Sequence, residues 1–325
     1  MKLRTVFAAM ALTVLPFAAQ AQDYPNRPIT MIVPFPAGGA TDIAARMVAQ
    51  KMTDIGGQPV IVENREGAGG IVGAVLVRDA DPDGYTILFA ASGTMILAPV
   101  VNPNVELVPT EDFRMVALAA QIVQYFVGPK EGPKTLGELV AAGKADPALL
   151  TFGSAGMGTL SHVAPAAFAT FAGVEIEHIP YKGTAPALGD VMGNRLSLLS
   201  DSASVIRGPV TEGMVVPLAV LANERTTAMP DVPTIGEAGF AGFMELSDWT
   251  SWMGVLAPKD TPDEVVDKLN EIVNAALVEP EVQAWMDNVT YLNKSGMTPA
   301  EADAYLAESV DQWRKVLTDL GLAAQ

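Results

Sequence analysis

Cysteine is absent from this chain of 325 residues. Its absence excludes disulfide bonds, thiolate metal sites, cysteine nucleophiles and a lipid anchor on cysteine. Histidine is almost as scarce, because His162 and His178 are the only two. Two histidines leave little for a catalytic triad and too little for a histidine-rich metal site. We therefore expect no catalytic residue, no metal and no cofactor.

Positive charge is also in short supply. The chain has 20 basic and 37 acidic residues, a net charge of −17, and removal of an N-terminal leader with Lys2 and Arg4 makes it −19. Such a field repels nucleic acid and anionic membranes, so neither is expected as a partner. It also repels anions at long range, so an anion site must be built locally from backbone amides and hydroxyls. Solubility alone would equally explain the charge.

Long apolar runs are confined to the N-terminus. Lys2 and Arg4 precede an apolar run over residues 6–19, and residues 19–21 read Ala-Gln-Ala. This is the pattern of a secretory signal peptide with its cleavage site, so we predict a leader at 1–21 and a mature start at Gln22. No other run approaches the length of about 18 residues that a spanning helix needs, so we expect a soluble mature protein.

The most informative stretch is a turn between a strand and a helix at residues 34–46. An apolar, β-branched run at 29–33 precedes it, and apolar residues at helical spacing follow it. Gly38 and Gly39 permit a tight turn, and Thr41 or Asp42 can cap the helix. Free N–H groups at such a helix start suit an anion. The alternative is an ordinary connection between strand and helix, in which Asp42 is only a cap.

Strand and helix patterns alternate along most of the chain. Strands are expected over residues 29–33, 59–63, 85–91, 113–119, 121–127, 150–152, 174–179, 196–199, 218–221 and 249–257. Alternation of this kind predicts parallel sheets covered by helices, with ligands beyond the carboxyl ends of the strands. A second glycine turn at 153–159 repeats the logic of the first, and Thr159 or Ser161 can cap the helix after it.

We expect two α/β lobes joined by crossing segments, with the two glycine turns facing each other across a cleft. Residues 22–122 with 249–325 form the first lobe, and residues 123–248 form the second. Helices over 262–276, 281–286 and 299–320 return to the first lobe without a sheet of their own. Trp249 is the better of two tryptophan candidates for the cleft because it lies where the chain returns to the first lobe.

Five motifs in this order resemble the solute receptors of tripartite tricarboxylate transporters, often called Bug proteins. They are Pro36-Ala37-Gly38-Gly39-Ala40-Thr41-Asp42 with Arg46, the turn 153–159 with His162, Pro180-Tyr181-Lys182-Gly183-Thr184, the segment 230–239, and Trp252 with 257–262. Together they cover nearly the whole mature chain. The sequence departs from the pattern of this family at two places. Pro165 lies early in a helix, and Ser200-Asp201-Ser202 stands where a Phe-Asp-Asn type of triplet is more usual.

This resemblance implies a monomeric periplasmic receptor of the Venus flytrap, type 2-like architecture. Such a receptor closes on a small di- or tricarboxylate, or an aromatic carboxylate, and hands it to the membrane permease subunits of the transporter. The positions implied to bind the ligand are Phe35, Ala37, Gly38, Gly39, Asp42, Ser92, Thr94, Ser154, Gly156, Gly158, Thr159, His162 and Asp201. A bulky side chain at Gly39 or Gly156 is expected to fill the site and leave the fold intact.

Two other functions compete with transport. A carboxylate receptor that signals to a membrane sensor kinase would use the same fold and pocket. A hydrolase would use Ser154 as its nucleophile, but residue 152 is Phe, so the Gly-x-Ser-x-Gly elbow is missing. Arg46 is expected in a structural ion pair. His162 is open to both a structural and a pocket role, and the identity of the carboxylate stays open.

Overall fold

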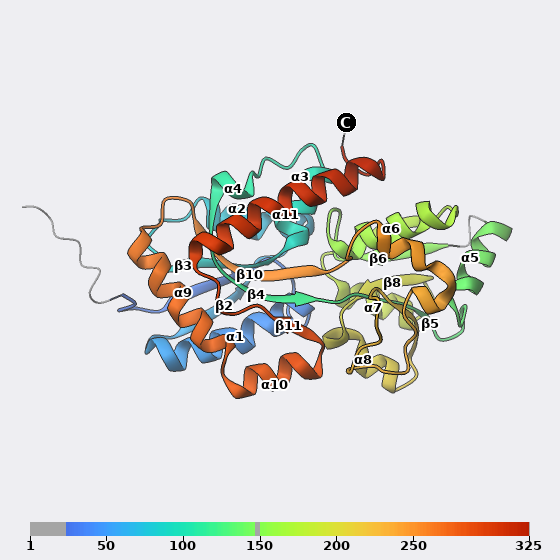
Figure 1. Ribbon diagram of the computed structural model, residues 1–325, viewed down its shortest axis with the longest axis horizontal. Helices are drawn as coiled ribbons and strands as arrows, with labels where there is room; N and C mark the ends of the chain where they lie inside the picture. The colour runs from blue at the N-terminus through green and yellow to red at the C-terminus, as the bar shows by residue number, and fades with distance from the viewer. Residues whose placement is uncertain (1–23, 147–149, 325) are drawn as a thin grey trace, which may run out of the picture.

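The computed structural model describes residues 24–146 and 150–324 and contains two β-sheets (Figure 1). The predicted signal peptide lies outside these residues. The first sheet has the order β11-β4-β10-β3-β1-β2 and the second β7-β6-β8-β5-β9. The strands are β1 (Ile29–Val33), β2 (Val60–Asn64), β3 (Thr86–Ala91), β4 (Phe113–Ile122), β5 (Tyr125–Pro129), β6 (Thr151–Ser154), β7 (Glu177–Pro180), β8 (Leu198–Asp201), β9 (Val215–Val220), β10 (Ser251–Pro258) and β11 (Tyr291–Asn293).

Helices flank both sheets, as the alternating pattern predicts (Figure 1). Those beside the first sheet are α1 (Ala40–Gly56), α2 (Ile71–Arg78), α3 (Ala98–Val101), α4 (Pro109–Asp112), α9 (Asp263–Leu277), α10 (Pro280–Asn288) and α11 (Pro299–Asp319). Those beside the second are α5 (Leu136–Ala145), α6 (Leu160–Ala172), α7 (Thr184–Met192) and α8 (Ala203–Thr211). Short helical turns are η2 (Ala68–Gly70), η3 (Gly93–Leu97), η5 (Gly236–Phe240) and η6 (Ala241–Glu245).

Each sheet combines parallel and antiparallel pairings. β1 pairs in parallel with β2 and β3, and β6 pairs in parallel with β7 and β8. The chain leaves the first sheet at the end of β4 and enters the second at β5 after two residues. It returns through β10, which pairs antiparallel with β4 along its whole length. Two neighbouring segments therefore connect the lobes, and the parallel strands of both end at the space between them.

A strand between the last helices was not predicted. β11 lies between α10 and α11 and pairs antiparallel with β4. Three residues are too few to show a period-two pattern. The last helices still have no sheet of their own, because β11 joins the first sheet. The helices themselves return to the first lobe, where α9 packs on α1 and α11 packs on β4.

One hydrophobic cluster joins the two lobes on one side of the cleft. It includes Phe113 on β4 of the first sheet, Phe126 on β5 of the second sheet, Phe168 on α6, and Trp249 at the start of the returning segment. Trp249 is fully buried, stacks on Phe243 at 4.3 Å between ring centroids, and donates its indole N–H to the Phe243 carbonyl at 2.9 Å. Trp249, the better of the two tryptophan candidates for the cleft, instead has the core role that is more usual for tryptophan.

The lobes also meet along a seam of small residues. Gly69, Gly93 and Ala98 of the first lobe face the turn 156–159 of the second. A Cβ atom added at Gly158 would lie 2.2 Å from the Ala98 Cα, and one added at Gly156 would lie 3.0 Å from the Gly69 Cα. Both glycines have positive φ, +80° at Gly158 and +126° at Gly156. We call these residues the glycine seam.

The glycine seam gives the second glycine turn a packing role between the lobes. This turn packs on η2 and η3 of the first lobe, whereas the first turn meets the second lobe through Pro36, whose ring lies against Gly183. The expectation that a bulky residue at Gly156 leaves the fold intact is wrong, because its side chain would overlap the backbone of Gly69.

Gly158→Ala tests the seam. A positive φ costs an alanine about 1–2 kcal/mol wherever it occurs. Gly173→Ala is the matched control, because Gly173 also has a positive φ, +65°, but nothing lies within 4 Å of an added Cβ. We expect Gly158→Ala to lower the free energy of unfolding by at least about 2 kcal/mol more than the control, as overpacking does. Urea denaturation measures this, and equal losses in the two variants would contradict the seam.

Candidate ligand-binding site

A pocket lies between the sheets, where the parallel strands of both end. Its free space is about 80 Å³, and one buried water needs roughly 10–15 Å³ of such space, so a small organic molecule fits. Its walls follow the ends of β1, β3, β6 and β8. They are formed by Phe35, Pro36, Gly39, Ala40, Thr41, Ala91, Gly93, Thr94, Ile122, Gln124, Ala155, Thr159, Leu160, Ser161, Gly183, Thr184, Asp201, Ser251 and Met253.

Three helix N-termini open onto this pocket. The first residues of α1, α6 and α7 line it, and no side chain caps any of the three helices. The first amides of a helix have no acceptor within the helix, and they carry the positive end of the helix dipole. The pocket wall therefore presents N–H donors from both lobes to whatever occupies it.

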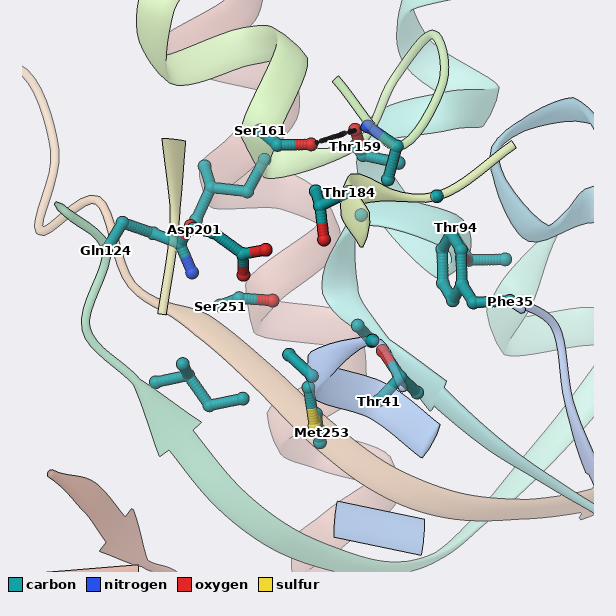
Figure 2. A pocket seen from close by; sticks show the side chains of 18 of the residues that line it. Phe35, Thr41, Thr94, Gln124, Thr159, Ser161, Thr184, Asp201, Ser251 and Met253 are labelled. Atoms are coloured by element: carbon teal, nitrogen blue, oxygen red, sulfur yellow. Dashed lines mark hydrogen bonds between the residues drawn. The ribbon is translucent and has the colours of Figure 1, made fainter. Parts of the chain in front are cut away.

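The hydroxyls beside α6 are used to hold the second turn rather than left free. Thr159 donates its hydroxyl proton to the Gly156 carbonyl at 2.8 Å. Ser161 therefore donates to Thr159 Oγ1 at 2.9 Å, the bond drawn in Figure 2, and its oxygen accepts from the Ala155 amide. Thr159 is the N-cap residue of α6, as predicted, but its hydroxyl does not cap the helix.

Polar side chains from the crossing segments complete the pocket. Figure 2 shows Gln124, Thr184 and Ser251 around the carboxylate of Asp201. Gln124 accepts from the Ser200 hydroxyl through Oε1 at 3.4 Å. Ser251 shares a hydrogen bond with Ser92 at 3.0 Å between the two oxygens. Every lining residue except Asp201 has a side chain that does not ionise.

Asp201 is the one charged group in the wall. It is the last residue of β8 and its side chain is 5% exposed. Oδ1 accepts from the Ser202 amide at 2.7 Å, but Oδ2 is buried with no hydrogen-bond partner among the described residues. Burial raises the pKa of Asp201 to about 6, against the opposing effects of the Thr184 hydroxyl and of Ser202.

Asp42 has a structural role beside the first turn. Gly39, not Thr41 or Asp42, is the N-cap residue of α1, so the predicted cap was wrong. The Asp42 carboxylate instead accepts from the Gly38 amide at 2.9 Å, from Arg46 and from Asn64. Burial acts to raise the pKa of Asp42, but these donors outweigh it and the pKa lies below its ordinary value. Arg46 forms the ion pair that was expected.

The two histidines stack beneath the second turn. Their ring centroids are 4.2 Å apart, and Phe152 stacks against them. His162 Nδ1 accepts from the Gly158 amide at 3.2 Å. Ser154 Oγ accepts from the Gly156 amide and shares a hydrogen bond of 2.6 Å with His178 Nε2. Because His162 accepts a hydrogen bond through Nδ1, its ring is neutral.

The pKa values agree with this geometry. Burial lowers the pKa of His162 to about 4, with a smaller contribution from His178, and burial lowers the pKa of His178 to about 4. The contact between Ser154 and His178 stabilises the second glycine turn. Ser154 is fully buried and does not line the pocket, so a substrate has no access to it.

Five of the thirteen residues implied to bind ligand line the pocket: Phe35, Gly39, Thr94, Thr159 and Asp201. The other eight do not. Ala37 and Gly38 lie exposed on the outer side of their turn, and Asp42 holds that turn. Ser92 is buried behind Ser251, and Gly156 and Gly158 belong to the glycine seam. Ser154 and His162 support the second turn from below.

Several residues that line the pocket were not predicted from the sequence. Thr184 follows Gly183 in a recognised turn, so its place at a helix start was a usable signal. Gln124 and Ser251 lie on the crossing segments, where a polar residue interrupts an apolar run. That interruption is a weaker signal, because the pairing that brings the two segments together is not visible in one sequence.

A second cavity of about 580 Å³ borders the glycine seam. Gly69, Ala98 and Gly156 contribute to it, together with Lys182. Lys182 lies 3.4 Å from the Glu66 carboxylate, so its charge already has a partner. This cavity is larger, but it lacks the convergent helix starts of the first. Within residues 24–146 and 150–324, no helix is long and apolar enough to cross a membrane, and no acidic or histidine cluster suits a metal.

Comparison with known proteins gives the family. Residues 44–322 match the tripartite tricarboxylate transporter family receptor. The chain belongs to this family. The resemblance drawn from the motifs is thereby confirmed, and this receptor is a solute-binding protein rather than an enzyme.

Solved structures show the same fold. The receptor is similar to the periplasmic binding protein BugD, with 34% identity, a TM-score of 0.87, and coverage of 93% of this chain and 100% of that one. It is similar to MatC (Rpa3494) from Rhodopseudomonas palustris with bound malate, with 31% identity, a TM-score of 0.84 and coverage of 90% and 100%. It is also similar to R. palustris Rpa4515 with adipate, with 30% identity, a TM-score of 0.86 and coverage of 93% and 99%.

The histidine pair predicts a loss of stability in acid. Between pH 6.5 and 4 the unfolded chain binds protons that the folded receptor does not, so the free energy of unfolding falls as pH falls. At pH 5 the expected loss relative to pH 7.5 is roughly 1–2 kcal/mol per histidine. Asp201 acts in the opposite direction, because its raised pKa favours the folded state in acid.

Denaturant unfolding of the receptor and of His162→Gln at pH 7.5 and 5.0 tests this. Glutamine can still accept from the Gly158 amide but does not titrate, so the variant should lose clearly less stability in acid than the wild type. An equal pH dependence in the two proteins would show that His162 does not titrate with an altered pKa.

Proposed function

We propose that this receptor binds a small carboxylate in the pocket between its lobes. The observation that carries the proposal is the convergence of three uncapped helix starts, from α1, α6 and α7, on a pocket whose lining residues include no lysine, arginine or histidine. A carboxylate is the common small anion that such a cradle suits. In a protein of net charge −17, the attraction has to be local.

The available interactions are strong enough. Each amide hydrogen bond to an ionised group contributes about 1.5–3 kcal/mol, and each helix dipole about 0.3–1 kcal/mol, or up to about 2 kcal/mol when partly buried. A few such bonds from both lobes reach micromolar affinity after the cost of association. A bridging carboxylate would also favour closure, because donors from both lobes contact the same group.

The similar structures support this ligand class. MatC is described with malate and Rpa4515 with adipate, and both molecules are dicarboxylates. Within the proposed class of a di- or tricarboxylate, or an aromatic carboxylate, these two relatives favour a dicarboxylate. The receptor would work as a monomer in the periplasm, after export by the leader at 1–21.

The family context supports a role in transport. We propose that the receptor delivers its ligand to the membrane permease subunits of a tripartite tricarboxylate transporter. Residues 22–122 with 249–325 would move as one lobe against residues 123–248. The two crossing segments are then the hinge, and the pocket is emptied when they let the lobes part.

A thermal-shift screen of the mature receptor tests carboxylate binding. The protein, begun at Gln22 and refolded to remove retained ligand, is compared with mono-, di-, tri- and aromatic carboxylates and with their amides. An acid at a hundredfold its dissociation constant should add about 2.7 kcal/mol of stability, and its neutral amide should add none. Equal shifts with acids and amides would refute the carboxylate cradle.

Gly39→Val tests whether the carboxylate binds in the pocket between the lobes. Gly39 has φ −80° and an added Cβ would have ordinary van der Waals contact with its neighbours, so valine fits the backbone. Because Gly39 lines the pocket, we expect at least a hundredfold loss of affinity with little change in melting temperature. Gly137→Val in the first turn of α5, away from the pocket, is the control. Wild-type affinity in Gly39→Val would exclude this pocket.

A further inference from the structure

Asp201 is not explained by a cradle for anions. Its carboxylate points into the pocket (Figure 2), and the residue is only 5% exposed. One oxygen, Oδ2, has no hydrogen-bond partner among the described residues. A buried carboxylate oxygen without a donor is costly, so its retention at this position calls for a partner that arrives with the ligand.

The surroundings supply no counter-charge. The other lining residues do not ionise. The hydroxyls of Thr184 and Ser202 oppose the effect of burial on the pKa of Asp201 but carry no charge, and two tyrosines are titratable neighbours of Asp201 among the described residues. Tyr125 is its register partner on β5, and Tyr291 on β11 bonds to the Ser202 and Ser204 hydroxyls. Burial raises the pKa of both tyrosines, so both are neutral. Among the described residues that line the pocket, no cation offsets the Asp201 charge.

A ligand carboxylate brings a second negative charge into the same small pocket. Two carboxylates in one enclosed site repel each other, which raises the pKa of one of them or weakens binding. A hydrogen-bond donor on the ligand removes this conflict if it reaches Oδ2 while the carboxylate meets the helix starts. The donor satisfies the unpartnered oxygen, and an ammonium group also offsets its charge.

We propose that Asp201 selects carboxylates that carry a second, hydrogen-bond-donating group, a hydroxyl or an ammonium, over the same acids without it. The proposal rests on the carboxylate function proposed above and adds the chemistry of the second contact. Asp201 is thus a specificity-determining residue, and the ligand class is hydroxy or amino carboxylic acids.

Isothermal titration with matched acids tests the proposal. Each set shares a carbon skeleton and differs only in the donor: succinate, malate and aspartate; glutarate, 2-hydroxyglutarate and glutamate; adipate and 2-aminoadipate; benzoate and 4-hydroxybenzoate. In the set that binds best at pH 7.5, we expect the hydroxy or amino acid to bind at least tenfold more tightly than the plain acid. Whichever of the hydroxy acid and the amino acid binds more tightly identifies the preferred donor group.

Asp201→Asn assigns the preference to this residue. Asparagine keeps the shape and removes the charge, so the preference should fall below about threefold and the plain acid should bind at least as tightly as to the wild type. Glu175→Gln, an exposed residue of the second lobe, is the control for the change in net charge and should keep the wild-type preference.

Each result decides between the two proposals. If no acid of any set binds the wild type, the carboxylate function itself fails. If acids bind but the donor makes no difference, or if Asp201→Asn keeps the preference, only the role of Asp201 fails. If the plain acid binds best and more tightly as pH falls from 8 to 5.5, Asp201 acts as a protonated donor and the proposal is overturned. The wild-type comparison decides even if the variant does not fold.

Discussion

The starts of α1, α6 and α7, which no side chain caps, are the feature on which the proposed binding site depends. Backbone donors cannot be moved by rotating a side chain, so the pocket works only when both sheets hold their helices in place. The supporting contacts serve this end: Asp42 fixes the Gly38 amide, and the stacked histidines fix the second turn. A local cradle of this kind lets an acidic protein hold an anion without a positive surface.

The glycine seam sets how closely the two halves of the cradle approach. Ala98 and Gly158 meet at a distance that leaves no room for a Cβ, and the same turn continues into the first residues of α6. Contact between the lobes and the shape of the pocket are therefore linked through one short stretch of backbone. Asp201 lies apart from this stretch, at the end of β8, so the proposed contact with the rest of the ligand is separate from the proposed contact with the carboxylate.

Much of the fold follows from sequence, because apolar runs and glycine turns mark the strands and helix starts. The strand before residue 34, the turn after β6 and the family were predicted correctly, whereas β11 was too short to show a pattern. The site was harder. Glycine is selected both for close approach to a ligand and for close approach between lobes, and Gly158 serves the second purpose. Trp249 and Gln124 depend on long-range pairing, which local pattern does not reveal.

A crystal structure of the mature receptor with the acid that stabilises it most would test the central claim most directly. The account predicts a carboxylate within about 2.7–3.1 Å of amide nitrogens in the first turns of α1 and α6, with no lysine or arginine in contact. An acid held in the other cavity by Lys182, or a carboxylate bound away from the helix starts, would contradict it.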